Sequence, residues 1–285
     1  MKGSGEPELR AELTLNVAIA GHRPRGLGSA SADAPARIEG RVGELLDRVA
    51  ARARALLAEP DAALLYAPAG AGAQPVLRML SSLAEGTDRI GARAALARGW
   101  ALFATLPFDR RVYEADFAPG ASQLAAGQDS VADFRELLER TRQEGAGPEQ
   151  VIELDGDPAD RDLGYALCGR VLASQADLML GVWDGREPER GHLAGTGPTL
   201  AAAYREGVPI LWITTDAEPA LRCTPVRADD DSSYTDVEAC RRIAALGTRE
   251  EVARGAAATF ALDTPEAIDA AVDELLRAIA LPAKP

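Results

Sequence analysis

Residues 81–88 read S-S-L-A-E-G-T-D, and they join two stretches of different pattern. The mostly apolar residues 76–80 come before them, and the helical pattern of 90–97, ending at Gly99, comes after them. This order predicts a buried strand, a tight turn of small residues and a helix. The free N–H groups and the positive dipole end of a helix favour phosphate or carboxylate. We therefore expect the rest of the chain to build a pocket over this turn.

The composition is that of a globular protein with an acidic balance. Its 285 residues are 47% hydrophobic, which is enough for one large α/β domain. The 31 basic and 44 acidic residues give a net charge of −13, which argues against a protein that mainly grips nucleic-acid phosphates. The three cysteines lack metal spacing and the N-terminus lacks an apolar signal core, so we expect a reduced, cytoplasmic protein. No apolar run approaches the ~18 residues of a membrane span, and no membrane association is expected.

Continuously apolar runs alternate with helical patterns along the chain. Strands are expected at 13–20, 76–80, 100–106, 151–154, 177–183 and 208–214, with 62–67 as a possible short one. Helices are expected at 38–56, 129–143 and 265–280 among others, and 26–35 has the composition of a loop. Because such apolar runs suit strands buried on both faces, we predict an α/β fold. It would be a doubly wound, mainly parallel Rossmann-like sheet with helices on both faces.

The chain has no long linker and no internal repeat. We expect a flexible N-terminus at 1–12 and one Rossmann-like domain at 13–215. Residues 216–285 would form a C-terminal extension packed on the same domain.

Polar clusters follow four of the expected strands. They are Gly21-His22-Arg23, residues 81–88, Pro107 with the residues after it, and residues 183–196. In a doubly wound sheet, ligands bind beyond the carboxyl ends of the strands. The fold therefore predicts one site shared by segments that are far apart in sequence.

The turn at 81–88 has two interpretations. In the functional one, the hydroxyls of Ser81 and Ser82 and the turn amides hold a phosphate, and Glu85 or Asp88 reaches a sugar hydroxyl or an amine. In the other, this is an ordinary strand-to-helix connection in which Gly86 makes the turn and Asp88 caps the helix.

The loop at 185–199 has the same two interpretations. Its glycines, Gly195 included, and Thr196 precede a helix that Pro198 suits as a first-turn residue, and this is typical of a phosphate-binding loop. The charged half at 186–190 is instead typical of a solvated surface loop.

Other candidate residues flank these turns. Arg23 can pair bidentately with a phosphate, and His22 is either an acid–base group or a structural histidine. Trp183 and Asp184 offer a stacking face and a carboxylate, or else a core tryptophan and a turn residue. Residues 109–116, with Tyr113 and Asp116, would form either a flap over the site or a capping turn.

Several common motifs are absent. The sequence has no G-x-x-x-x-G-K-[ST], H-E-x-x-H, C-x-x-C or G-x-S-x-G, and G-H-R-P stands where a dinucleotide fold would carry G-x-G-x-x-G. We therefore expect no metal and no nicotinamide cofactor.

Taken together, these segments resemble the SLOG superfamily. This Rossmann-like group contains the Smf/DprA DNA-processing proteins and the LOG (lysine-decarboxylase-like) phosphoribohydrolases. The segment S-S-L-A-E-G-T-D-R-I-G resembles the Smf/DprA turn "SGLARGID" and, more closely, the "LAEGAD" of stand-alone SLOG proteins. The G-H-R start, the L-P-F…Y-E-A-D-F stretch and the V-W-D-G…G-T loop are similar to that branch as well. The resemblance covers about residues 13–215 and implies a nucleotide pocket lined by Gly21, Arg23, Ser81, Glu85, Gly86, Asp88, Gly195 and Thr196.

The resemblance implies three functions, namely sensing of a nucleotide-derived ligand, LOG-like hydrolysis of a nucleoside monophosphate, and single-stranded DNA binding. The LOG pattern P-G-G-x-G-T-x-x-E carries a catalytic Glu where this chain has Thr199, and no P-G-G precedes it. Glu85 or Asp184 would have to supply the carboxylate that stabilises a ribosyl cation. The acidic balance disfavours DNA. The sequence thus predicts a self-associating protein that binds or senses a nucleotide-type ligand, with the hydrolase as the alternative.

Overall fold

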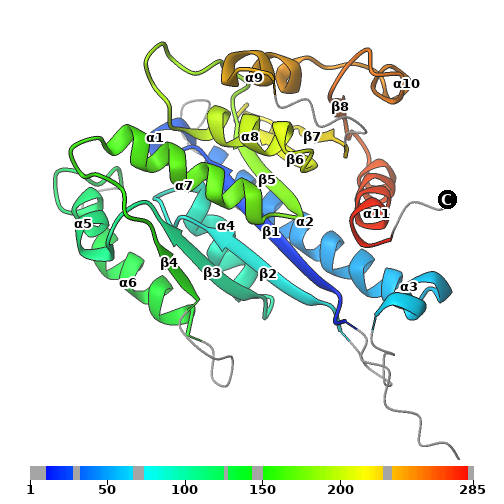
Figure 1. Cartoon of the computed structure of the whole chain (residues 1–285), viewed down its shortest axis with the longest axis horizontal. Helices are drawn as coiled ribbons and strands as arrows, with labels where there is room; N and C mark the ends of the chain where they lie inside the picture. Colours follow the sequence, from blue (N-terminus) through cyan, green and yellow to red (C-terminus); the bar gives the residue numbers. More distant parts are fainter. Residues whose placement is uncertain are drawn as a thin grey trace, which may run out of the picture.

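The computed structural model describes residues 11–27, 33–66, 74–124, 128–142, 150–226 and 233–281. Eight strands within these residues form one sheet in the order β4-β3-β2-β1-β5-β6-β7-β8 (Figure 1). The strands are β1 (Thr14–Gly21), β2 (Val76–Ser81), β3 (Ala101–Leu106), β4 (Val151–Glu153), β5 (Leu178–Trp183), β6 (Ile210–Thr214), β7 (Leu221–Thr224) and β8 (Phe260–Ala261). Strands β1 to β6 run parallel, while β7 and β8 are antiparallel to their neighbours. The expected mainly parallel α/β sheet is confirmed.

The order of the strands contains a reversal between β1 and β5. From β1 the chain moves outward through β2 and β3 to β4, and then returns to β5 on the other side of β1 before continuing to β6. Such a switch point opens a crevice at the carboxyl ends of the two strands. Here the His22 amide donates to the carbonyl of Val182 at 3.2 Å and ties the two strand ends together.

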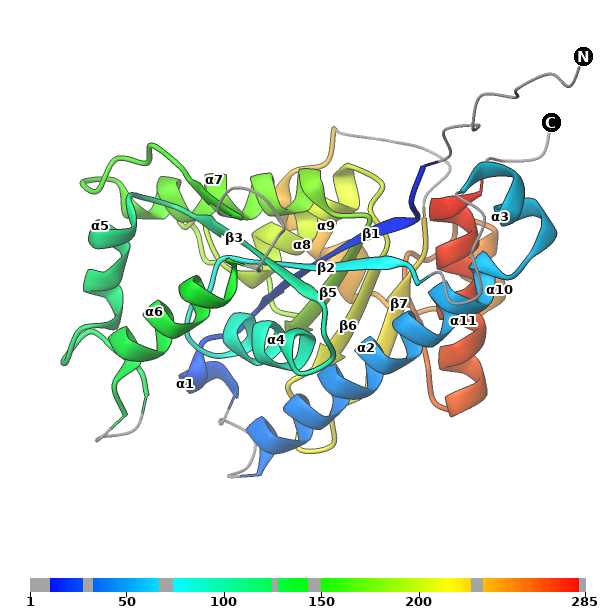
Figure 2. The same cartoon turned by 90° about the horizontal axis from the view of Figure 1, so that it is seen from below.

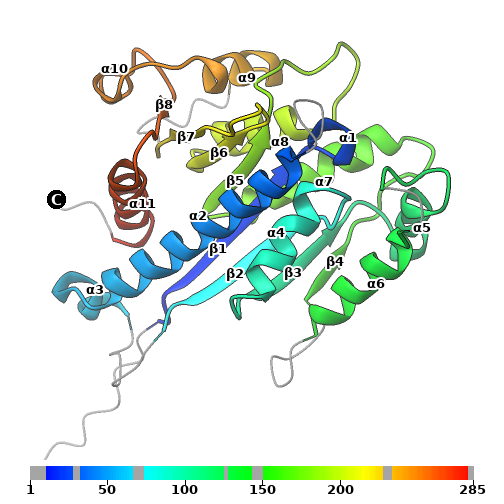
Figure 3. The same ribbon diagram turned by 180° about the vertical axis from the view of Figure 1, so that it is seen from behind.

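Helices cover both faces of the sheet (Figure 2). Figure 3 shows α2, α4 and α6 across one face, and α7, α8 and α9 lie on the other. The helices are α1 (Pro24–Leu27), α2 (Ala34–Leu57), α3 (Pro60–Leu65), α4 (Thr87–Leu96), α5 (Arg110–Glu114), the 3-10 turn η1 (Ala115–Phe117), α6 (Ser130–Arg140), α7 (Arg161–Gln175), α8 (Thr196–Arg205), α9 (Asp236–Ala244), α10 (Arg249–Ala253) and α11 (Pro265–Ala280). In the part of the chain that the structure describes, no helix has the length and apolar character needed to cross a bilayer.

The amphipathic patterns correctly predicted the positions of two longer helices. The expected helix at 38–56 is α2, whose apolar stripe, Leu46 included, is buried against the sheet. The helix expected at 129–143 is α6, which begins after Asp129 because that carboxylate accepts a hydrogen bond from the Ala132 amide at 2.9 Å.

Some local expectations were wrong. Residues 62–66 are not a strand but belong mostly to α3, which starts at Pro60 because proline suits the first helical position. The expected loop at 26–35 begins inside α1, and α2 starts at Ala34; residues 28–32 of this loop lie outside the described residues. Most of the segment expected to be flexible, 1–12, also lies outside them. Beyond residue 216 the chain adds β7 and β8 to the sheet edge, and the sequence pattern gave no sign of these strands.

One close crossing of the backbone brings the connections after β1 and β2 together. The Thr87 amide and its hydroxyl both donate to the carbonyl oxygen of His22, at 3.2 and 3.1 Å. Gly86 has φ +90°, and a Cβ placed there would lie 2.6 Å from that oxygen and 3.0 Å from the Arg23 Cα. Only glycine allows the two backbones to approach this closely.

We therefore expect Gly86→Ala to lower the free energy of unfolding by about 2–4 kcal/mol, because it combines an unfavourable φ with a backbone clash. Gly99→Ala is the matched control, since Gly99 also has a positive φ of +75° but no atom within 4 Å of a Cβ. That variant should lose only about 1–2 kcal/mol. Urea denaturation monitored by circular dichroism measures both losses. Equal losses would show that the crossing is not tightly packed.

Candidate functional site

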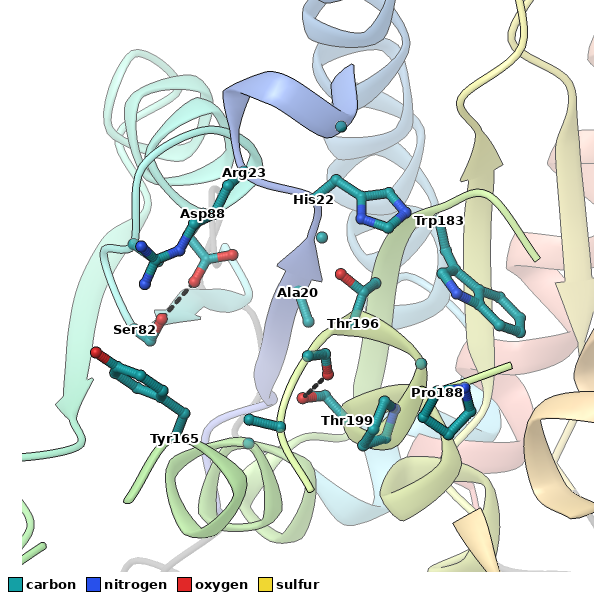
Figure 4. A pocket seen from close by; sticks show the side chains of 18 of the residues that line it. Ala20, His22, Arg23, Ser82, Asp88, Tyr165, Trp183, Pro188, Thr196 and Thr199 are labelled. Atoms are coloured by element: carbon teal, nitrogen blue, oxygen red, sulfur yellow. Dashed lines mark hydrogen bonds between the residues drawn. The ribbon is translucent and has the colours of Figure 1, made fainter. Parts of the chain in front are cut away.

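A cavity of about 870 Å³ opens at the carboxyl ends of β1, β2, β3 and β5, beside the switch point (Figure 4). The sides of α7 and the first turn of α8 complete it. Of the thirteen residues proposed from the sequence as ligand-binding, ten line this cavity: Gly21, His22, Arg23, Ser82, Asp88, Pro107, Trp183, Asp184, Gly195 and Thr196. Ser81, Glu85 and Gly86 do not line it.

The turn between β2 and α4 uses its polar groups within the chain. The fully buried Ser81 hydroxyl donates to the Asp88 carbonyl and accepts from the Leu83 amide, each at 3.1 Å. The Asp88 carboxylate accepts from the Ser82 hydroxyl at 2.5 Å and from the Ala84 amide. The turn thus already holds an anion, and that anion is the chain's own carboxylate.

Burial is the main influence on the Asp88 carboxylate. It raises the pKa of Asp88 to about 6, against the lowering effects of the Ser82 hydroxyl, the Arg23 charge and the Ala84 amide. Asp88 is only 6% exposed, and Figure 4 shows its carboxylate beside the Arg23 guanidinium at the cavity wall. Its charge therefore changes with pH inside the cavity.

Glu85 is directed away from the cavity and ties segments of the chain together. Its carboxylate accepts from the hydroxyls of Ser122 and Ser130, both at 2.5 Å, and from the Gln123 amide at 2.8 Å. Burial opposes the charged form, but these hydrogen bonds keep the pKa of Glu85 below its usual value. The carboxylate is thus ionised, 1% exposed and fully engaged. It is a structural anchor for the segment leading to α6.

Arg23 stands on the cavity wall next to a small charged cluster. Its Nη2 lies 3.9 Å from Asp116 Oδ2, and its Cζ lies 5.8 Å from the ring centre of Tyr165. Asp116 is itself hydrogen-bonded by Arg161 and by the Tyr165 hydroxyl. Because Asp116 already has two closer partners, the Arg23 guanidinium keeps donors for a ligand.

Residues 109–116 were expected to form either a flap over the site or a capping turn. The first of them makes a capping turn. Asp109 caps α5 by accepting from the Arg111 amide at 2.9 Å. Tyr113 lines the cavity but is 1% exposed, and its ring packs edge-on against Phe117 and Phe134. Burial, the largest cause, raises the pKa of the Tyr113 hydroxyl well above its usual value, so it is a neutral donor.

His22 and Asp184 face each other across the switch point. The Asp184 amide donates to His22 Nε2 at 3.2 Å, and Asp184 Oδ1 lies 3.3 Å from the same nitrogen. Both side chains are about a quarter exposed, at 25% and 28%. They form the solvent-facing, polar part of the cavity wall.

Trp183 is mainly a core residue. It is 1% exposed and packs against Trp212 with ring centres 5.3 Å apart. It reaches the cavity only at its edge, so the broad stacking face expected from the sequence is turned toward the core.

The first turn of α8 forms the opposite wall. Gly195 precedes it with φ +121°, which releases the chain into the helix, and the Thr199 hydroxyl donates back to the Gly195 carbonyl at 3.0 Å. Thr196 and Gly197 line the cavity, and first-turn amides have no acceptor within their own helix.

The loop between β5 and α8 is held at two points. The Asp162 carboxylate of α7 accepts from the amides of Leu193 and Ala194, at 2.6 and 3.2 Å. Earlier in the loop, Glu187 forms an ion pair with Arg241 of α9 at 2.5 Å. The loop brings Asp184, Glu187 and Glu189 to the cavity together with Arg186, which pairs with Asp184 at 3.5 Å, so this rim carries more acidic than basic side chains.

The sequence pattern did not indicate the cavity residues that α7 contributes. Tyr165, Cys168, Gly169 and Leu172 line the cavity. Cys168 is buried, its thiol donates to the Thr105 carbonyl at 3.1 Å, and burial raises the pKa of the thiol far above its usual value. A helical pattern alone does not show that this helix crosses over the carboxyl end of β3.

No protein-family model matches the sequence, and no curated protein matches it either. Among solved structures, the fold is similar to DNA processing protein A (DprA) from Streptococcus pneumoniae. The TM-score is 0.38 and the identity 16%, over 70% of this chain and 50% of that one. The chain thus spans about half the length of that protein.

Proposed function

We propose that the protein binds, as a sensor or binding protein, a nucleotide or nucleotide-derived ligand in the cavity at the switch point. The observation that carries this proposal is that one cavity is lined by a cationic side chain and by the N-terminus of a helix. Arg23 and the first turn of α8 both line it. Its volume of about 870 Å³ lies in the range of small-molecule and cofactor sites.

The phosphate end of the ligand is assigned to α8 and Arg23. The amides of Thr196 and Gly197 and the positive end of the helix dipole favour an anion. Arg23 adds a guanidinium that can donate two hydrogen bonds to phosphate oxygens. The turn after β2 was the first candidate from the sequence, but Asp88 and the His22 carbonyl already use its donors.

The acidic rim suits the other end of a nucleotide. Carboxylates accept hydrogen bonds, so Asp184 and its acidic neighbours fit ribose hydroxyls or a base amine rather than phosphate. A ligand with a phosphate at one end and donors at the other fits both walls. The sequence resemblance to stand-alone SLOG proteins supports the same ligand class.

Fewer carboxylates can serve the hydrolase alternative than the sequence suggested. Glu85 is buried and fully hydrogen-bonded outside the cavity, and Thr199 stands where the LOG pattern has its Glu. Of the two carboxylates proposed from the sequence, Asp184 remains for stabilising a ribosyl cation, because it lines the cavity and is partly exposed. Binding of single-stranded DNA has least support, since the rim and the whole chain are acidic.

The first test is calorimetric binding of AMP, NAD and ADP-ribose to the full chain and to Arg23→Gln. We expect the variant to bind roughly ten- to a hundredfold more weakly, because a charge-assisted hydrogen bond is lost. Arg25→Gln is the matched control, since Arg25 is an exposed neighbour that does not line the cavity.

The outcomes separate the proposals. Binding that Arg23→Gln and Arg25→Gln weaken equally, or no binding of any of the three compounds, would contradict this site. Chromatography of the mixture then distinguishes sensor from hydrolase. An intact ligand supports the sensor, whereas a free base that no longer appears with Asp184→Asn would establish the hydrolase.

The pH dependence of binding is a second prediction. Below about pH 6 Asp88 is protonated and neutral, and above it the carboxylate places a negative charge in the cavity wall. Affinity for ADP-ribose, whose pyrophosphate does not titrate in this range, should therefore fall roughly three- to tenfold as the pH rises from ~5 to ~7. In Asp88→Asn the fall should disappear. Calorimetry at several pH values checks this, and an identical fall in both proteins would be evidence against Asp88 as its source.

A further inference from the structure

The outward face of α7 is apolar, unlike the outer face of an ordinary surface helix. Leu163 and Leu167, one helical turn apart, are 39% and 41% exposed. Figure 1 looks onto this face, with α7 in front of the sheet. The inward face of the same helix lines the cavity through Tyr165 and Cys168, so α7 carries apolar side chains on two sides.

The apolar surface continues onto the sheet edge. Ile152 of β4 is 43% exposed, and its register partner in β3 is Thr105. The carbonyl of Thr105 accepts the thiol hydrogen bond of Cys168, the residue after Leu167. Val151 packs on the core of the other face, so Ile152, the next residue in the strand, points to the side of the sheet that α7 covers. Figure 1 shows no described helix in front of β4, and Figure 3, the view from behind, shows α6 on the opposite side.

Charged residues bracket the two leucines in a definite order. Asp160 is the N-cap of α7, where its carboxylate accepts from the Leu163 amide at 3.2 Å, and Arg170 lies three residues after Leu167. Helical spacing brings Leu163, Leu167 and Arg170 to one face, and Asp160 lies at the N-terminal end of the helix. Asp160 and Arg170 are both exposed, and Arg170 has no ion pair with any residue that the structure describes. The face thus has an acid at one end, a base at the other and leucines between them.

We propose that this face of α7, with Ile152 beside it, is the interface through which two copies of the chain form a twofold dimer. In an antiparallel pairing of two α7 helices centred on position 165, Leu163 of each copy meets Leu167 of the other. The same pairing brings Asp160 of each copy to Arg170 of the other. A twofold interface must be self-complementary in this way, with residue i on j and j on i. The acid-to-base order along the helix matches a second copy laid antiparallel to it.

The first experiment is sedimentation velocity of the full chain over a wide concentration range. We expect a monomer–dimer equilibrium whose dissociation constant rises about tenfold or more in Leu167→Glu, because a charge replaces a leucine at the centre of the contact. Leu64→Glu is the matched control, since Leu64 is also an exposed helix leucine, 73% exposed on α3, away from this face. A wild-type protein that stays monomeric, or two variants that dissociate equally, would overturn the proposal.

A charge exchange tests the orientation. Arg170→Glu alone opposes two like charges at each end of the interface, and so does Asp160→Lys alone. In an equimolar mixture, a dimer of one variant with the other restores opposite charges at both ends. The introduced carboxylate meets the introduced ammonium at one end, and the native Asp160 meets the native Arg170 at the other.

We expect each variant to be largely monomeric and the mixture to form dimers, with thermal unfolding showing that both variants are folded. Failure of the mixture to dimerise, with both variants folded, would exclude the antiparallel arrangement. None of these residues lines the cavity, so the variants leave the lining of the ligand site unchanged.

Discussion

The carbonyl oxygen of His22, which receives both the amide and the hydroxyl of Thr87, is the contact on which the site depends. It fastens the end of β1 to the start of α4, and Gly86 makes the approach possible because a Cβ would enter the space of that oxygen. The His22 amide meanwhile holds the Val182 carbonyl of β5. His22 thus joins the ends of β1 and β5 to the start of α4, and the cavity wall forms around it.

This packing also decides where an anion can bind. The start of α4 has the general character of an anion site, yet the Thr87 amide donates to the His22 carbonyl, and Asp88 takes the Ser82 hydroxyl and the Ala84 amide of the preceding turn. Filling the turn with a buried carboxylate fixes the loop without a ligand, at the cost of an acid whose pKa is raised to about 6. The free donors of the site then belong to the start of α8 and to Arg23. Two similar strand–turn–helix connections therefore have different roles, one structural and one open to a ligand.

The sequence predicts the central part of the fold because its strands are buried on both faces and read as uninterrupted apolar runs. It fails where local pattern is weak: residues 62–66 are alanine- and leucine-rich, and Pro60 makes them helical. The short strands β7 and β8 depend on pairing partners that are distant in sequence. At the site, the sequence correctly identifies segments but not side-chain directions. Glu85 turns away because its partners Ser122 and Ser130 arrive from a separate segment, and Tyr165 enters because α7 crosses β3.

The two faces of α7 connect the cavity with the proposed dimer surface. Asp162 holds the amides of Leu193 and Ala194 in the loop that lines the cavity, and its neighbour Leu163 stands on the outward face. Leu193 is itself 45% exposed beside it. A ligand that contacts this loop and a second copy that packs on α7 would therefore contact two elements that this pair of hydrogen bonds joins. Where two binding events share a structural element, any coupling between them is reciprocal. The fold thus offers a direct physical route by which occupancy of the cavity and association of the chain influence each other.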